Sequence, residues 1–166
     1  MLLFNRCLNE QIHKLDNSSD FWMAYAINMA NIAFMNDEVP VGAVIVKDNK
    51  VIGSGFNSVI ADCSVTGHAE INAINAASKK LNNYRLLDCD MYVTLEPCHM
   101  CSKAIVDARI KNLFIGALEP KSGSVVSVDN FLDAKFLNHK VNYESGFLDK
   151  ESASLLKSFF RSRRDK

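Results

Sequence analysis

The sequence predicts a single three-layer α/β domain, and two features of the chain carry this prediction. Short β-rich runs alternate with segments whose apolar residues recur at helical spacing, which is typical of a sheet covered by helices. With 166 residues and 48% hydrophobic content, the chain is long enough to bury one sizeable core. We therefore expect one domain over residues 18–166, preceded by an extension of residues 1–17 that shows little pattern.

The first half of the domain is expected to contain a helix, a hairpin and a second helix. Segment 17–37 opens with Ser and Asp capping candidates and then spaces its apolar residues as a helix does. Two β-rich runs within 39–57 are joined by a short polar turn at 48–50, which predicts a hairpin. The alanine-rich segment 67–81 predicts the second helix.

The second half continues the alternation of strands and helices. A proline at the start of one segment stands where a helix N-terminus accepts it. The expected elements are a strand at 90–95, a helix at 97–110, a strand at 112–117, a fifth strand at 140–145 and a terminal helix at 149–164.

Composition narrows the range of functions. The chain has 19 Lys+Arg and 19 Asp+Glu, so it lacks the overall basic excess of many nucleic-acid binders, and any such contact must come from a local patch. Five cysteines are an odd number, and Arg6 and Glu10 interrupt the first apolar run before a signal-peptide core could form. We expect a cytoplasmic protein with reduced thiols. No apolar run approaches the roughly 20 residues that span a bilayer, so no membrane partner is expected.

Two cysteines, Cys98 and Cys101, stand three positions apart in the segment TLEPCHMC. At the first turn of a helix their sulfurs share one face, where the helix dipole favours the thiolate form that binds metals. The spacing alone fits a redox dithiol, a pair of buried structural cysteines, or half of a zinc site.

A third ligand candidate, His68, opens the preceding predicted helix. Helices that follow neighbouring strands commonly bring their N-termini to the same edge of a sheet, so His68 can converge with the two cysteines. Three protein ligands leave the fourth tetrahedral position of zinc for water, which is the arrangement of a catalytic site. Glu70, two residues after His68, should project near the metal without binding it and act as a general acid/base.

These residues resemble a known signature. His68-Ala69-Glu70 and Pro97-Cys98-x-x-Cys101 are similar to the H-x-E and P-C-x-x-C motifs of the zinc-dependent nucleoside and nucleobase deaminases. The segments EVPVGAV, NYRLLD, YVTLEPCHMC and SFFRSRR further resemble the bacterial tRNA-specific adenosine deaminases, over about residues 20–164.

The resemblance implies a cytidine-deaminase-like fold, with a five-stranded mixed sheet between helices, in a homodimer that carries one Zn²⁺ per subunit. The implied reaction is hydrolytic deamination of adenosine to inosine at the wobble position (34) of a tRNA anticodon, with tRNA-Arg as the expected substrate. The implied site consists of the zinc ligands His68, Cys98 and Cys101, the general acid/base Glu70, and the base-binding residues Asn57 and Ala69.

The terminal helix ends in a local basic patch. Its arginines could contact phosphates and its aromatic rings could stack on unpaired bases, although a cationic helix C-terminus also complements the macrodipole. One of the two adjacent phenylalanines is expected to belong to the core. The candidates for RNA contact are Phe159, Phe160, Arg161, Arg163, Arg164 and, from the loop 118–123, Lys121.

Glu119 and Pro120 depart from the DAKTG-like loop that is common in the family, which affects the expected substrate preference but not deamination.

Two other functions remain open: a zinc deaminase of free bases or nucleosides such as guanine, cytosine or cytidine, and a non-catalytic zinc-stabilised RNA-binding module. Glu70 and the lack of a fourth ligand candidate beside the motif argue against the module. A deaminase of free bases would not need the basic and aromatic residues at the end of the terminal helix. Residues 1–17 have no counterpart in the family pattern, so they represent either a disordered extension or a choice of start site.

Overall fold

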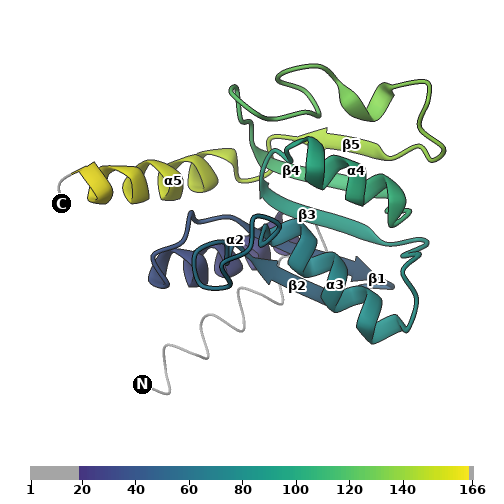
Figure 1. Ribbon diagram of the computed structural model, residues 1–166, viewed down its shortest axis with the longest axis horizontal. Coiled ribbons are helices and arrows are strands. Elements are labelled where there is room, and N and C mark those ends of the chain that lie inside the picture. The colour runs from purple at the N-terminus through teal and green to yellow at the C-terminus, as the bar shows by residue number, and fades with distance from the viewer. Residues whose placement is uncertain (1–18, 165–166) are drawn as a thin grey trace.

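The computed structural model describes residues 19–164, so the extension predicted for residues 1–17 lies outside the described residues. A five-stranded mixed sheet forms the centre of the protein, with the strand order β2-β1-β3-β4-β5 (Figure 1). β1 is antiparallel to both of its neighbours, whereas β3, β4 and β5 are parallel to one another. The strands are β1 Gly42–Lys47, β2 Lys50–Phe56, β3 Asp90–Leu95, β4 Asn112–Ala117 and β5 Asn142–Ser145. The predicted fold class is confirmed.

Helices cover both faces of this sheet. α3 and α4 lie on the face turned toward the viewer in Figure 1, and α2 packs on the opposite face with α5 beside it. The helices are α2 Ser19–Met35, α3 Ala69–Leu81, α4 His99–Asp107 and α5 Asp149–Arg164, with one short 3-10 turn, η1 Phe131–Asp133. Within residues 19–164, no helix is both long and apolar enough to cross a bilayer.

Alternate side chains of the central strands supply the two cores. In β1, Ala43 and Ile45 pack in the core shared with α3 and α4, while Val44 and Val46 pack against Trp22 of α2 and its neighbours. Because successive residues of a strand point to opposite faces, one strand supports both helical layers. The sheet therefore supports the helices on both of its faces.

Close packing of α3 on β2 fixes the N-terminus of that helix. A Cβ atom at Gly55 would lie 2.4 Å from the carbonyl oxygen of Ala69, and one at Gly53 would lie 2.5 Å from that of Ala73. Only glycine leaves room for this approach, since real Cβ atoms do not come so near another atom. The contact holds the first turn of α3, which carries the predicted site residues, at a set height above the sheet.

The two helices that carry the signature begin later than predicted. The prediction started a helix at Pro97, but α4 begins at His99 because Cys98 has extended backbone angles (φ −76°, ψ 171°) and is the N-cap. His68 likewise caps α3, with φ −80° and ψ 149°. An N-cap residue stands half outside the helix, so its side chain can turn toward a neighbouring element.

The hairpin turn is shorter than the predicted 48–50. Asp48 and Asn49 have positive φ angles of 49° and 55°, and Lys50 already pairs with Lys47 in the ladder. A two-residue turn with both angles positive matches the twist of the strands, and Asp and Asn tolerate it well.

Candidate active site

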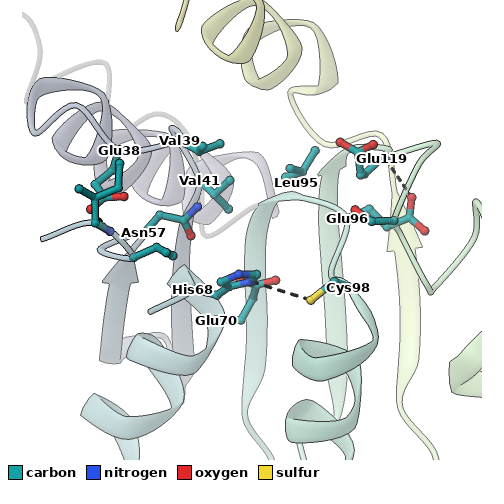
Figure 2. Close-up of a pocket in the computed structure, with 13 residues that line it drawn as sticks. Glu38, Val39, Val41, Asn57, His68, Glu70, Leu95, Glu96, Cys98 and Glu119 are labelled. Atoms are coloured by element: carbon teal, nitrogen blue, oxygen red, sulfur yellow. Dashed lines mark hydrogen bonds between the residues drawn. The ribbon is translucent and has the colours of Figure 1, made fainter. Parts of the chain in front are cut away.

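The N-termini of α3 and α4 meet at the floor of a pocket (Figure 2). Their N-cap residues, His68 and Cys98, make no capping hydrogen bond through their side chains, which instead face each other. The unpaired N–H groups of a helix N-terminus give it a partial positive charge that stabilises nearby anions. Two such ends at one place favour thiolate and carboxylate groups there.

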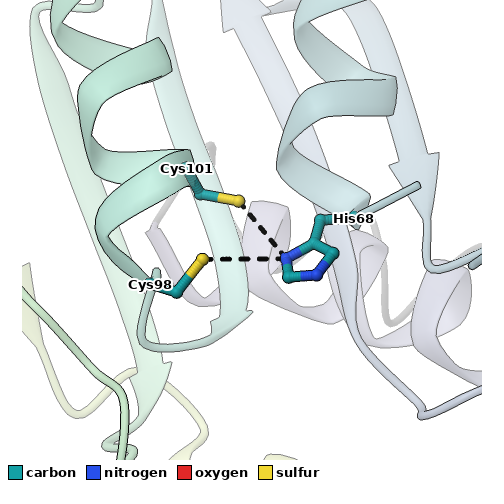
Figure 3. A group of neighbouring side chains, drawn as sticks. All are labelled: His68, Cys98 and Cys101. Carbon is teal, nitrogen blue, oxygen red and sulfur yellow. Dashed lines mark hydrogen bonds between the residues drawn. The ribbon is translucent and has the colours of Figure 1, made fainter. Parts of the chain in front are cut away.

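Three candidate metal ligands converge at this point (Figure 3). The Nδ1 atom of His68 lies 3.8 Å from the sulfur of Cys98 and 3.5 Å from the sulfur of Cys101. All three donor atoms lie within 4.8 Å of one another. In a tetrahedral zinc site, with Zn–S near 2.3 Å and Zn–N near 2.05 Å, nitrogen and sulfur ligands stand about 3.6 Å apart. The arrangement therefore fits a tetrahedral metal ion.

The pKa shifts of the three side chains also bear on whether they can bind a cation. Hydrogen bonds from Cys101 and His68 hold the pKa of the Cys98 thiol well below its ordinary value, despite partial burial. The hydrogen bond with Cys98 in turn raises the pKa of His68, while Cys101, which is fully buried beside this thiolate, has a raised pKa. A thiolate is the form of cysteine that binds a metal, so the surroundings of Cys98 favour the form that a metal ligand needs.

Glu70 lies in the first turn of α3, is 4% exposed and lines the pocket next to His68. Burial raises the pKa of its carboxyl group, and a backbone hydrogen bond and the charge of His68 oppose this effect only in part. A raised pKa favours the protonated form of a carboxyl group, which is the form that can donate a proton. The structure thus places a buried carboxyl group, the predicted general acid/base, beside the candidate ligands.

The pocket has a volume of about 310 Å³, at the lower end of the roughly 300–1,000 Å³ typical of small-molecule sites. Apolar side chains form part of its walls, and the polar groups concentrate at the floor and rim. The residues that line it include Val39, Val41 and Leu95 on the walls, His68, Glu70 and Cys98 at the floor, and Glu38, Asn57, Glu96 and Glu119 around them.

Asn57 lies on the wall next to α3. Its Oδ1 atom accepts a hydrogen bond of 2.9 Å from the backbone N–H of Ala69, the first residue of that helix. Asn57 and Ala69 are thus brought together as two predicted base-binding residues, but the Ala69 N–H is occupied by Asn57, and Ala69 does not line the pocket. The Asn57 amide nitrogen is the group left to meet a ligand.

Two buried glutamates at the pocket were not predicted from the sequence. Glu38 accepts hydrogen bonds of 2.8 Å from the backbone N–H groups of Ile60 and Ala61 with one carboxylate oxygen. Glu96 receives its bonds from the loop that follows β4. Burial alone would raise the pKa of Glu96, but hydrogen bonds from Ser127, Val126 and Glu119 outweigh it and hold the pKa below its ordinary value. Glu96 directly follows the buried strand β3, and this position was its sequence signal, whereas Glu38 lies before the start of β1 at Gly42 and had no such signal.

The predicted RNA-contact residues on α5 do not share one environment. Phe159 is 5% exposed and packs edge-on against Phe34 of α2, whereas Phe160 is 50% exposed. Phe159 is therefore the core residue of the pair. Arg163 donates hydrogen bonds to Asp37, the residue before the pocket-lining Glu38, and its guanidinium lies over the ring of Phe159.

The remaining cationic candidates are exposed. Arg161 and Arg164 lie at the solvent-exposed end of α5. Lys121 is exposed on the loop after β4, where its backbone N–H donates a 2.9 Å hydrogen bond to the Glu119 carboxylate. Because Arg163 ties α5 to the segment before Glu38, the end of α5 stands beside one rim of the pocket, and Lys121 stands on the loop that supplies Glu119 and Ser122 to its lining.

The chain is similar to known deaminases over most of its length. The MafB19-like deaminase family matches residues 17–164. A tRNA-specific adenosine deaminase of Haemophilus influenzae is 44% identical over 144 residues, which cover 86% of this chain and 83% of that protein.

Solved structures agree in fold. A structure from a study of A-to-I editing by tRNA:A34 deaminases at the wobble position superimposes with a TM-score of 0.79 at 43% identity, covering 81% of this chain and 98% of the other. A guanine deaminase of Nitrosomonas europaea superimposes with a TM-score of 0.75 at 21% identity, covering 86% and 84% of the two chains. The second likeness concerns the fold alone.

Proposed function

Because the chain belongs to the family of tRNA-specific adenosine deaminases, we propose that it hydrolyses adenosine to inosine at the wobble position (34) of a tRNA anticodon. One observation carries the proposal. A histidine nitrogen and two cysteine sulfurs stand 3.5–3.8 Å apart at the floor of a pocket, with the buried carboxyl group of Glu70 beside them. This combination of a three-ligand metal site and a proton carrier is what hydrolytic deamination requires.

The residues that would hold the metal are His68, Cys98 and Cys101, and zinc is the proposed ion. One imidazole nitrogen and two thiolates in tetrahedral spacing suit zinc better than the oxygen-preferring Mg²⁺ or Ca²⁺. A zinc ion held by three protein ligands supplies a polarised water molecule that is nucleophilic near neutral pH.

Glu70 transfers protons in the reaction, first as a general base and then as a general acid. Its carboxylate accepts a proton from the attacking water as the bond from oxygen to C6 of the purine forms. The same carboxyl then returns a proton to the amino group, the C6–N bond breaks and ammonia leaves. Water and adenosine give inosine and ammonia, and Glu70 ends the cycle in its initial state.

Asn57 and the apolar walls orient the base. The hydrogen bond from Ala69 fixes the plane of the Asn57 amide, so the amide nitrogen can donate to an acceptor on the purine edge. Val39, Val41 and Leu95 provide apolar surface for the two faces of a splayed base and exclude bulk water from its surroundings.

Contacts outside the pocket would select RNA over a free nucleoside. Phe160 presents an exposed ring for stacking, and Arg161, Arg164 and Lys121 present exposed charges for phosphates. Phe159 and Arg163 contribute indirectly, since they hold α5 against α2 and Asp37.

The relationship to the family supports four further proposals. Residues 18–166 form a single zinc-dependent deaminase domain, and the enzyme is a homodimer with one zinc ion per subunit. Its location is the cytoplasm, where the cysteines stay reduced, and its substrate is the anticodon stem-loop of tRNA-Arg.

Mass spectrometry of a tRNA pool after incubation with the purified protein tests the proposed function. We expect inosine to appear in the anticodon fragment of tRNA-Arg, with an equal amount of ammonia released. Inosine in no tRNA fragment would contradict the proposal.

A further inference from the structure

Glu96, which directly precedes Pro97 and Cys98, is a buried carboxylate that contacts no candidate metal ligand through its hydrogen bonds. It is 3% exposed, and both of its oxygens point into the loop that follows β4 (Figure 2). The five donors that it collects are the backbone N–H groups of Glu119 (2.9 Å), Val125 (3.1 Å), Val126 (2.7 Å) and Ser127 (2.9 Å), and the hydroxyl of Ser127.

The loop closes tightly around this carboxylate. A Cβ atom at Gly123 would lie 2.3 Å from the carboxyl carbon of Glu96, so the residue at 123 must be glycine for the loop to enclose the group. The backbone N–H and the hydroxyl of Ser124 add bonds of 2.9 and 3.1 Å to the carbonyl of Pro97. Segments 96–97 and 119–127 are thus joined by a network of polar contacts, while the fully buried Val125 anchors the loop in the core.

The loop has little regular structure of its own. Residues 118–130 form no helix or strand, and the bonds within the loop include Gly123 N–H to the carbonyl of Glu119 and Val128 N–H to that of Gly123. Without the Glu96 carboxylate, four backbone N–H groups would lose their acceptor. Unpaired buried N–H groups are costly, so the loop would have to open to water.

Two residues of this loop, Glu119 and Ser122, line the same pocket as Glu70 and His68. The position of that wall therefore depends on the charge and length of the Glu96 side chain. A glutamine of equal size would turn an NH₂ donor toward N–H groups that need an acceptor.

We propose that Glu96 is a positioning residue that holds the 119–127 loop as a wall of the pocket and thereby sets the affinity for the substrate rather than the rate of bond breaking. This inference rests on the proposed function for its kinetic part, whereas its structural part concerns the loop alone. Glu96 forms no hydrogen bond with the proposed metal ligands or with Glu70. A change at Glu96 should therefore leave the residues proposed to carry out the reaction in place.

The test compares Glu96→Gln with the wild-type enzyme and with Glu144→Gln, a matched change at an exposed residue of β5. Hydrogen exchange of the 118–128 peptide, followed by mass spectrometry, should accelerate about 10- to 100-fold in Glu96→Gln and stay unchanged in the control, because the loop amides lose their acceptor. Zinc content should remain at one per chain. KM for tRNA should rise about tenfold while kcat stays within about threefold.

A loop exchange rate equal to that of the wild type, or a loss of kcat with KM unchanged, would overturn the proposal. If Glu96→Gln does not fold, Ser127→Ala removes only one of the five donors and should accelerate exchange of the same peptide to a smaller extent, and unchanged exchange in that variant would also overturn it. A wild-type enzyme that does not act on tRNA would refute the proposed function, but the exchange comparison would still decide the role of Glu96.

Discussion

The Nδ1 atom of His68 lies 3.5 Å from the sulfur of Cys101, although 33 positions separate the two residues in the chain. The contact joins the start of α3 to the start of α4, and the sheet beneath them holds both helices in place. A site built across two helix N-termini in this way is held by the packing of both helices on the sheet. Its geometry can therefore be tested one residue at a time.

Replacing Cys101 with serine should remove most of the bound metal and most of the activity. A hydroxyl group is a much poorer ligand for zinc than a thiolate, and Cys101 is fully buried against the other two donors. Elemental analysis of the purified variant measures the loss. Cys63→Ser, at an exposed cysteine away from the site, should keep one zinc per chain. Full zinc and full turnover in Cys101→Ser would exclude this cysteine as a ligand.

Replacing Glu70 with glutamine should leave the metal and the fold but lower kcat by about 10²- to 10⁴-fold, the usual contribution of a positioned general acid/base. The amide keeps the size of the side chain but cannot exchange protons near neutral pH. Single-turnover rates with tRNA, together with zinc analysis, separate this effect from loss of the ion. Deamination at a near-normal rate would leave the reaction without its proposed base.

The two adjacent phenylalanines of α5 should respond in opposite ways. Phe159→Ala should lower the free energy of unfolding by about 3–5 kcal/mol, because the buried ring leaves a cavity next to Phe34. Phe160→Ala should change stability little but weaken binding of an anticodon stem-loop by about 1–3 kcal/mol if its ring stacks on a base. Urea unfolding and RNA titration measure the two quantities. Equal effects of both changes on stability would contradict the assignment.

Arginines at the end of α5 should contribute to RNA binding through charge. Arg161→Ala and Arg164→Ala remove exposed cations, so each should lower the slope of log K against log salt by roughly 0.7 if it neutralises one phosphate of a single strand. Arg163→Ala is the comparison, because Arg163 is engaged with Asp37 and Phe159 and should affect the position of α5 instead. Titrations at several salt concentrations distinguish the two cases, and unchanged slopes in both exposed variants would argue against phosphate contact.

Much of the fold followed from periodicity and from short polar turns, and strands β3 and β4 and helix α5 begin and end where the pattern predicts. The convergence of His68 with Cys98 and Cys101 was predicted from the rule that helices after neighbouring strands start at one edge of the sheet. In the structure β1 lies between β2 and β3, but these two strands run in the same direction, so the helices that follow them still start at the same edge. The roles of Glu38 and Glu96 were not, since their partners are backbone N–H groups of loops whose course no periodic pattern describes. Which of Phe159 and Phe160 is buried also depends on the placement of α2, which the local sequence of α5 does not contain.

A side-by-side assay of four substrates tests the central claim most directly. The purified protein is incubated separately with unmodified tRNA carrying a wobble adenosine, with free adenosine, with guanine and with cytidine, and the release of ammonia and the formation of inosine are followed. We expect ammonia to be released fastest from the tRNA, with inosine formed in equal amount, and this preference to weaken as salt rises, since phosphate contacts are screened. Faster release of ammonia from any of the three small substrates than from the tRNA would contradict this account and favour a deaminase of free bases or nucleosides.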